Sequence, residues 1–130
     1  MKIILDKEES EKFFHNALCN SMGEVCGYGL SLDYDDKEYK AAVKKLKDAS
    51  PNSIICREDV WMQILKDGGS LHLIDEENDD EKHTIKLADV HEKVSKVEIR
   101  HLTDMITEND DACTGDVIIQ TVFFGEIVYG

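Results

Sequence analysis

The sequence predicts a single α+β domain that is mainly helical and contains a small antiparallel sheet. With 130 residues, 42% of them hydrophobic, the chain is long enough to bury one core without metal or disulfide bonds. Stretches with apolar residues at helical spacing occupy more of the chain than stretches that alternate apolar and polar residues. No internal repeat, linker or low-complexity segment divides the sequence, so residues 1–130 are expected to form one domain.

The first part of the chain predicts a strand, a helix and a second strand. The apolar run KIIL at 2–5 is typical of a short buried strand. Asp6 and Glu9 have the spacing of a capping box, which predicts a helix from residue 7 to 21. Glycines then indicate a turn, and YGLSLDYD at 28–35 alternates as a half-buried strand does. The buried face of the helix is expected to contain Phe13, Phe14, Ala17 and Leu18.

Two more helices are predicted in the middle of the chain. One begins at Asp35 or Asp36 and ends before Pro51, the only proline. The other covers REDVWMQILKD at 57–67 and is followed by two glycines, which is typical of a helix C-terminus. Their buried faces are expected to contain Tyr39, Ala42, Val43 and Leu46 in the first and Val60, Trp61, Ile64 and Leu65 in the second.

The remaining segments predict a hairpin and further helices. SLHLID at 70–75 and KHTIKL at 82–87 alternate like two paired strands. ADVHEKV at 88–94 and EIRHLTDMI at 98–106 have helical spacing. The C-terminal segment is ambiguous, because its β-branched and aromatic residues favour a strand. The spacing of its apolar residues predicts a helix from about residue 111 to 124 instead, and we expect the helix.

The net charge of −13, from 28 acidic and 15 basic residues, limits the possible partners. Nucleic acids and anionic membranes would repel such a chain, whereas a protein with a basic surface would be attracted. The N-terminal apolar run is too short for a signal-peptide core, and no stretch is long enough to span a membrane. We therefore expect a soluble, cytoplasmic protein whose four cysteines are reduced.

The run DEENDDE at 75–81, in which six of seven residues are acidic, could be a metal-binding loop or a solvated turn. A calcium loop of the EF-hand type needs glycine at its sixth position, where this run has Asp80. Buried unpaired carboxylates are costly, so the run is expected to form an exposed connection between two strands without a specific metal site.

Other residue patterns give little support to chemistry. His15 and Cys19 have the spacing of a zinc-ligand pair, but a closed zinc site needs four ligands and no second pair exists. No known catalytic or nucleotide-binding motif is present, so the sequence predicts neither catalytic residues nor a cofactor, and an enzyme is the less favoured interpretation. Tyr129 is the aromatic residue expected to be exposed or to contact a partner.

The acidic residues recur in four clusters, at 6–11, 33–38, 75–81 and 108–111. Carboxylates on one face can imitate the phosphates of a duplex and occupy the basic groove of a DNA-binding protein. Alternatively, the clusters only keep the protein in solution. A different interpretation is a small module that binds a nucleotide or metabolite. The sequence is also compatible with a homo-oligomer. The predicted partner-binding residues are Asp33, Asp35, Asp36, Asp75, Glu76, Glu77, Asp79, Asp80, Glu81 and Tyr129.

The segments EDVWMQILKDGGSLHLID, DVHEKV and DVIIQTVFFGEIVYG resemble small acidic hypothetical proteins of bacteriophages and gut-bacterial mobile elements. That family has no assigned activity, so the resemblance implies no functional residues. It does imply a protein that binds and inhibits a factor of the host cell.

Overall fold

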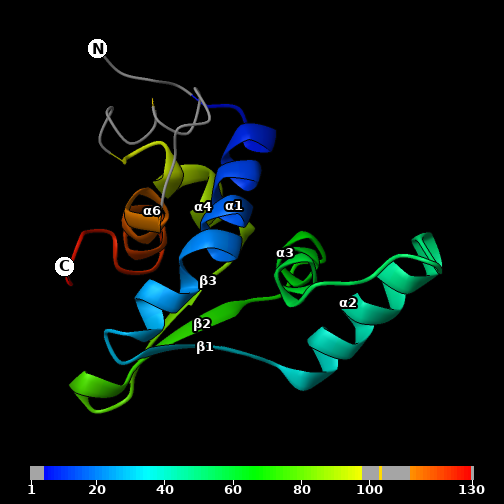
Figure 1. Ribbon diagram of the computed structural model, residues 1–130, viewed down its shortest axis with the longest axis horizontal. Coiled ribbons are helices and arrows are strands. Elements are labelled where there is room, and N and C mark those ends of the chain that lie inside the picture. The colour runs from blue at the N-terminus through cyan, green and yellow to red at the C-terminus, as the bar shows by residue number, and fades with distance from the viewer. Residues whose placement is uncertain (1–4, 98–102, 104–111, 130) are drawn as a thin grey trace.

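The computed structural model describes residues 5–97, 103 and 112–129 and shows the predicted α+β domain. Its described elements are five α-helices, one short 3-10 helix and a three-stranded antiparallel sheet (Figure 1). The fold class predicted from the sequence is therefore confirmed. None of the described helices combines the length and the apolar character that crossing a membrane requires.

Helix α1 spans Lys7–Cys26 and begins at the predicted capping box. The Glu9 N–H donates to Asp6 Oδ1 at 2.8 Å, and the Asp6 N–H donates to Glu9 Oε1 at 3.3 Å. The predicted end at residue 21 is too early. The helix continues through Gly23 because Met22 and Val25 extend its buried face, and this burial offsets the roughly 1 kcal/mol cost of a helical glycine.

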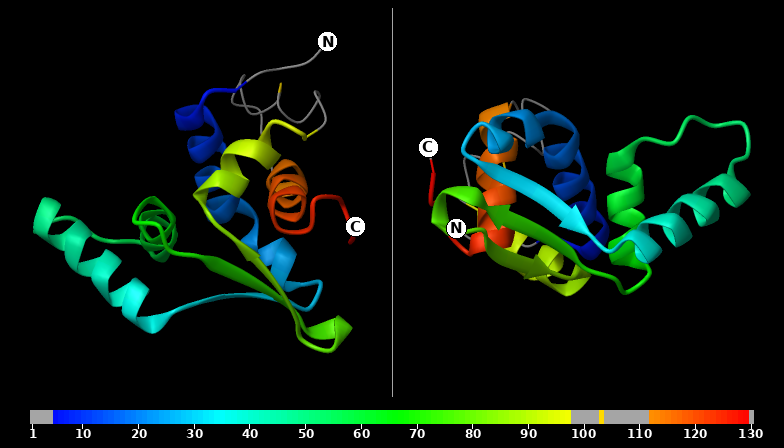
Figure 2. Two further views of the ribbon diagram at one scale, coloured as in Figure 1. Left: turned by 180° about the vertical axis from the view of Figure 1, so that it is seen from behind. Right: turned by 90° about the horizontal axis from the view of Figure 1, so that it is seen from below.

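The sheet has the order β1-β2-β3, so the two predicted hairpin strands are neighbours and the first strand pairs with β2. The strands are Leu30–Tyr34 (β1), Leu71–Asp75 (β2) and Glu81–Ile85 (β3), each slightly shorter than predicted. Leu32 pairs with Leu73, which pairs with His83. Helices α1, α4 and α6 lie against one face of the sheet, as the view from below in Figure 2 shows. The strand residues Leu30, Leu71, Leu73 and Ile85 are buried.

Helices α2 (Asp36–Ala49) and α3 (Arg57–Lys66) connect β1 to β2 and match their predictions closely. The Glu38 N–H donates to Asp35 Oδ2 at 3.1 Å, so Asp35 caps α2. Gly68, with φ +89°, lies just beyond α3 in the left-handed conformation that ends many helices. Helix α2 packs mainly against α3 and extends away from the rest of the domain (Figures 1 and 2).

The C-terminal half of the core is formed by α4 (Leu87–Val94) and α6 (Ala112–Phe124). The ambiguous C-terminal segment is therefore a helix, as expected, and the strand alternative is wrong. Helix α6 packs along α1, with Ile118, Ile119 and Val122 fully buried. The predicted helix at 98–106 lies outside the described residues apart from Thr103. The predicted strand at 2–5 also lies outside them, except for Leu5, which belongs to no strand.

Gly115 sets how closely α6 approaches α1. A Cβ atom at this position would lie 2.9 Å from Ser21 Cβ and 3.3 Å from the backbone Cα of Ala17. Replacing Gly115 with Ala is expected to lower the free energy of unfolding by about 1–3 kcal/mol, the usual effect of overpacking a core.

Urea denaturation would measure this change, with Gly23→Ala as the matched control in a helix. A Cβ at Gly23 would meet nothing within 4 Å. The control should stabilise the protein slightly, by up to about 1 kcal/mol, because alanine favours helix formation. Equal stabilities for the two variants would contradict close helix packing at Gly115.

Candidate functional site

The acidic hairpin, defined here as residues 76–81, comprises the connection from β2 to β3 and Glu81, the first residue of β3. Glu76–Asn78 form a 3-10 turn, and Asp79 and Asp80 follow with φ of 56° each. Aspartate enters this left-handed region more easily than most residues, which explains how the loop turns without glycine. All six residues are exposed, so the predicted exposed connection is confirmed for this part of the run.

Asp75 corrects the prediction, because it is 1% exposed rather than part of the solvated loop. Side chains alternate along a strand, which places Asp75 on the same face as Leu71 and Leu73. The Tyr129 hydroxyl lies 2.8 Å and 2.7 Å from the two carboxylate oxygens of Asp75 and donates to them. The Asn78 amide adds a longer contact at 3.4 Å. Asp75 therefore acts in the fold and is not available to a partner.

Tyr129 is also not the freely exposed aromatic residue that the sequence suggested. Its ring is half-buried and stacks on Tyr28 with 5.6 Å between centroids. The backbone N–H groups of Val128 and Tyr129 donate to Gln120 Oε1, each at 2.8 Å. Gln120 Nε2 donates to the Tyr129 carbonyl at 2.9 Å and to Asp116 Oδ1 at 2.8 Å. The C-terminal segment is thus fixed to α6.

The hydrogen bond to the Asp75 carboxylate raises the pKa of the Tyr129 hydroxyl to about 12. Desolvation and the negative charges of Asp75, Glu77 and Glu81 act in the same direction. The hydroxyl therefore keeps its proton, and its bond to Asp75, throughout the neutral range.

The other predicted partner-binding residues lie far from the acidic hairpin. Leu30 pairs with Asp75 at one end of the sheet, and Tyr34 pairs with Leu71 at the other. Asp33 is exposed near this second end, and Asp35 and Asp36 start α2 there. The structure therefore does not bring the acidic residues at 33–36 together with the hairpin.

A groove between α1 and α3 was not predicted from the sequence. It encloses about 570 Å³. Each helix contributes four residues with the spacing i, i+3, i+4 and i+7, which places them on one helical face. The lining residues are Glu8, Glu11, Lys12 and His15 from α1, Asp59, Met62, Gln63 and Lys66 from α3, and Leu46 from α2.

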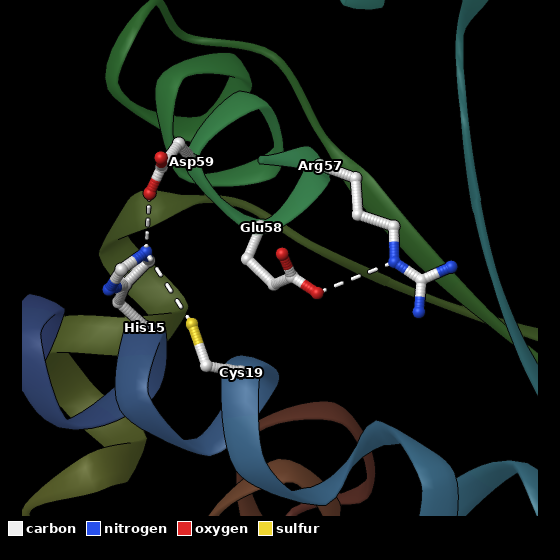
Figure 3. A network of polar contacts seen from close by, with 5 residues as sticks. All are labelled: His15, Cys19, Arg57, Glu58 and Asp59. Atoms are coloured by element: carbon white, nitrogen blue, oxygen red, sulfur yellow. Dashed lines mark hydrogen bonds and ion pairs between the residues drawn. The ribbon is translucent and has the colours of Figure 1, made fainter. Parts of the chain in front are cut away.

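His15 joins the two helices beside this groove (Figure 3). Its Nε2 lies 2.8 Å from Asp59 Oδ1 and 3.8 Å from Cys19 Sγ. A catalytic Cys–His–Asp arrangement uses the two imidazole nitrogens for different partners. Here the carboxylate and the thiol contact the same nitrogen, so a neutral His15 that donates to Asp59 cannot accept the proton of Cys19.

The electrostatic surroundings of Cys19 also oppose nucleophilic chemistry. Desolvation and the carboxylates of Glu58 and Asp59 raise the pKa of the Cys19 thiol above its ordinary value. Reactive cysteines need a lowered pKa, because the thiolate is the nucleophile. Cys19 is therefore an exposed thiol without activation, and Cys19, Cys26 and Cys56 all have free thiols.

His15 and Cys19 lie close together, as the zinc-pair spacing suggested, and Asp59 contacts the same imidazole nitrogen of His15. Within residues 5–97, 103 and 112–129, no three His, Cys, Asp or Glu side chains are grouped so that they could hold a metal ion. The residues of these ranges therefore do not assemble a closed zinc site, which needs four ligands.

Comparisons with known proteins add no assignment: no family model, curated protein or solved structure matches the chain. The resemblance to phage and mobile-element proteins stays an expectation from the sequence.

Replacing Tyr129 with Phe tests whether its hydroxyl holds the C-terminal segment to the sheet. The variant leaves the buried Asp75 carboxylate without its two shortest contacts, so the melting temperature should fall by roughly 3–6 °C. Tyr39→Phe is the matched control, because Tyr39 stacks on Tyr34 but forms no hydrogen bond through its hydroxyl in the described structure. A shift of similar size in both variants would show that the hydroxyl of Tyr129 has no special role.

The same bond predicts a loss of stability at alkaline pH. The folded-state pKa of about 12 exceeds the ordinary value of 10.0, so the folded state holds this proton more tightly. Its contribution is complete below pH 10.0 and is lost as the pH rises towards about 12. Denaturation from pH 8 to 12 should therefore show wild type converging with Tyr129→Phe. A constant difference between them would contradict the raised pKa.

Proposed function

We propose that the protein is a non-enzymatic interaction protein that binds a basic protein partner through its acidic surface. The observation that carries this proposal is the unneutralised charge of the acidic hairpin. It has five exposed carboxylates, and in the described structure none of them forms an ion pair with lysine or arginine. Among the described residues, Glu81 Oε1 also lies 3.4 Å from Nε2 of His83 on β3, a contact that is an ion pair only when the imidazole is protonated.

Some basic side chains form ion pairs elsewhere on the surface. The ion pairs of lysine with aspartate or glutamate involve α2, α4 and residues just beyond the ends of α3 and α4. They are Lys45–Asp67 at 2.7 Å, Lys93–Asp89 at 3.9 Å and Lys96–Glu92 at 3.1 Å. The hairpin thus holds five of the 28 acidic residues without a lysine or arginine ion pair in the described structure, and a basic partner would be steered towards that end of the sheet.

Duplex mimicry, the more specific form of the hypothesis, receives no support from the positions of the clusters. Imitation of phosphates needs carboxylates along one face. The hairpin and residues 33–36 lie at opposite ends of the sheet, and residues 6–11 begin α1. The cluster at 108–111 lies outside the described residues. We therefore propose a local contact with a basic protein, and the sequence resemblance suggests a host factor as that partner.

The alternative, a module that binds a nucleotide or another small anion, fits the groove poorly. Glu8, Glu11 and Asp59 line it against Lys12 and Lys66, so carboxylates outnumber ammonium groups. A polyanion would be repelled there. A thermal-stability screen with nucleotides would reveal such a ligand as a rise in melting temperature, because a ligand that binds only the folded state stabilises it.

The double variant Asp79→Asn/Asp80→Asn tests the role of the hairpin charge. Asparagine also tolerates the left-handed backbone found at both positions, so stability should change by no more than about 0.5 kcal/mol. A partner captured from host lysate and identified by mass spectrometry should associate roughly two- to fivefold more slowly with the variant, and capture should weaken as salt is raised.

The control is Asp48→Asn/Glu92→Gln, which removes the same charge from exposed positions on α2 and α4. Its association rate should stay close to that of wild type. An equal effect of both variants would mean that overall charge, and not the hairpin, attracts the partner. Binding that is insensitive to salt and to both variants would contradict the proposed function.

A further inference from the structure

The groove between α1 and α3, called here the α1–α3 groove, is a concave surface that the acidic hairpin does not contribute to. Its volume of about 570 Å³ falls in the usual range of binding clefts, roughly 300–1,000 Å³. Two helical faces with the same spacing line it, and they touch where His15 contacts Asp59. Such a groove has the form that accepts side chains from one face of a third helix.

The chemistry of the α1–α3 groove combines apolar and negatively charged surface. Leu46 and Met62 provide apolar atoms, and Met62 is buried while Leu46 is partly buried. Glu8 is exposed and has no ion pair in the described structure, and Glu11 contacts only His91, at 3.0 Å. An apolar side chain of a partner fits against Leu46 and Met62 while a lysine or arginine of the same partner approaches Glu8 and Glu11.

The two lysines in the lining reduce the negative charge of the groove but leave an excess, because three carboxylates face two ammonium groups. Lys12 and Lys66 are exposed, and long lysine side chains can keep their ammonium groups in water. The glutamate side chains are shorter, so their charges stay nearer the helix surface.

We infer that the α1–α3 groove is the docking site for a basic amphipathic helix of the partner. This inference rests on the proposed function and assigns separate roles to the two acidic surfaces. The convex hairpin accelerates association through long-range attraction, whereas the groove, which buries side chains, determines how slowly the complex dissociates.

A defined probe tests the inference without knowledge of the partner. The probe is a fluorescein-labelled helical peptide of about 15 residues with leucines on one face and lysines on the other. Its association and dissociation rates are measured by stopped-flow fluorescence anisotropy. The comparison peptide has the same composition in an order that gives no apolar face.

Two variants alter the groove by different means. Glu8→Lys reverses a charge in its lining, and Gln63→Trp fills it without changing the charge. Glu76→Lys is the matched control, with the same charge reversal on the hairpin. Circular dichroism shows whether each variant keeps its helical content. Because there are two groove variants, the test still works if one of them fails to fold.

Both groove variants should raise the dissociation rate about tenfold or more, and Glu76→Lys should lower mainly the association rate. If the peptide dissociated faster from Glu76→Lys and at the wild-type rate from both groove variants, docking would take place at the hairpin. That result would overturn the inference and leave the proposed function intact. Equal affinity for the reordered peptide would also overturn it, because attraction would then depend on charge alone. Absence of salt-dependent binding to either peptide would contradict the proposed function as well.

Discussion

The buried carboxylate of Asp75, at the end of the central strand, is the interaction on which the C-terminal part of the fold depends. An ionised carboxylate removed from water costs several kcal/mol unless hydrogen bonds compensate it. The compensating donor is the Tyr129 hydroxyl, at 2.7 and 2.8 Å. Tyr129 reaches this position because Gln120 binds the backbone of the segment that follows α6. The sheet, α6 and the C-terminal segment are therefore positioned together by one polar network.

Local signals predicted most of the fold. Capping residues located the starts of α1 and α2, because Asp6 and Asp35 bind backbone N–H groups in ways that short sequence patterns reveal. The type of α6 was harder to predict, because it is apolar on nearly every side and its periodicity is weak. The end of α1 was misplaced for another reason: tertiary packing of Val25 overrides the weak helix propensity of Gly23.

The candidate sites were predictable only in part. Six acidic residues in seven suggested an exposed loop, yet the alternation of Leu71, Leu73 and Asp75 already indicated a buried final position, and that signal was missed. Gln120, a side-chain amide within the apolar run VIIQTVFF, was the other available signal for a buried network. No sequence pattern could have revealed the α1–α3 groove, because its two faces come from helices separated by 30 residues.

The fold also separates the acidic residues into groups that a count of charges cannot distinguish. Asp6, Asp35 and Asp89 accept backbone N–H groups at helix starts, where carboxylates stabilise the helix and are partly neutralised by its dipole. Asp75 and Asp116 are buried in the network around Tyr129 and Gln120. The hairpin carboxylates have neither a structural role of this kind nor a lysine or arginine partner in the described residues. An acidic surface that the fold does not need for its own stability is the surface that a basic partner can use.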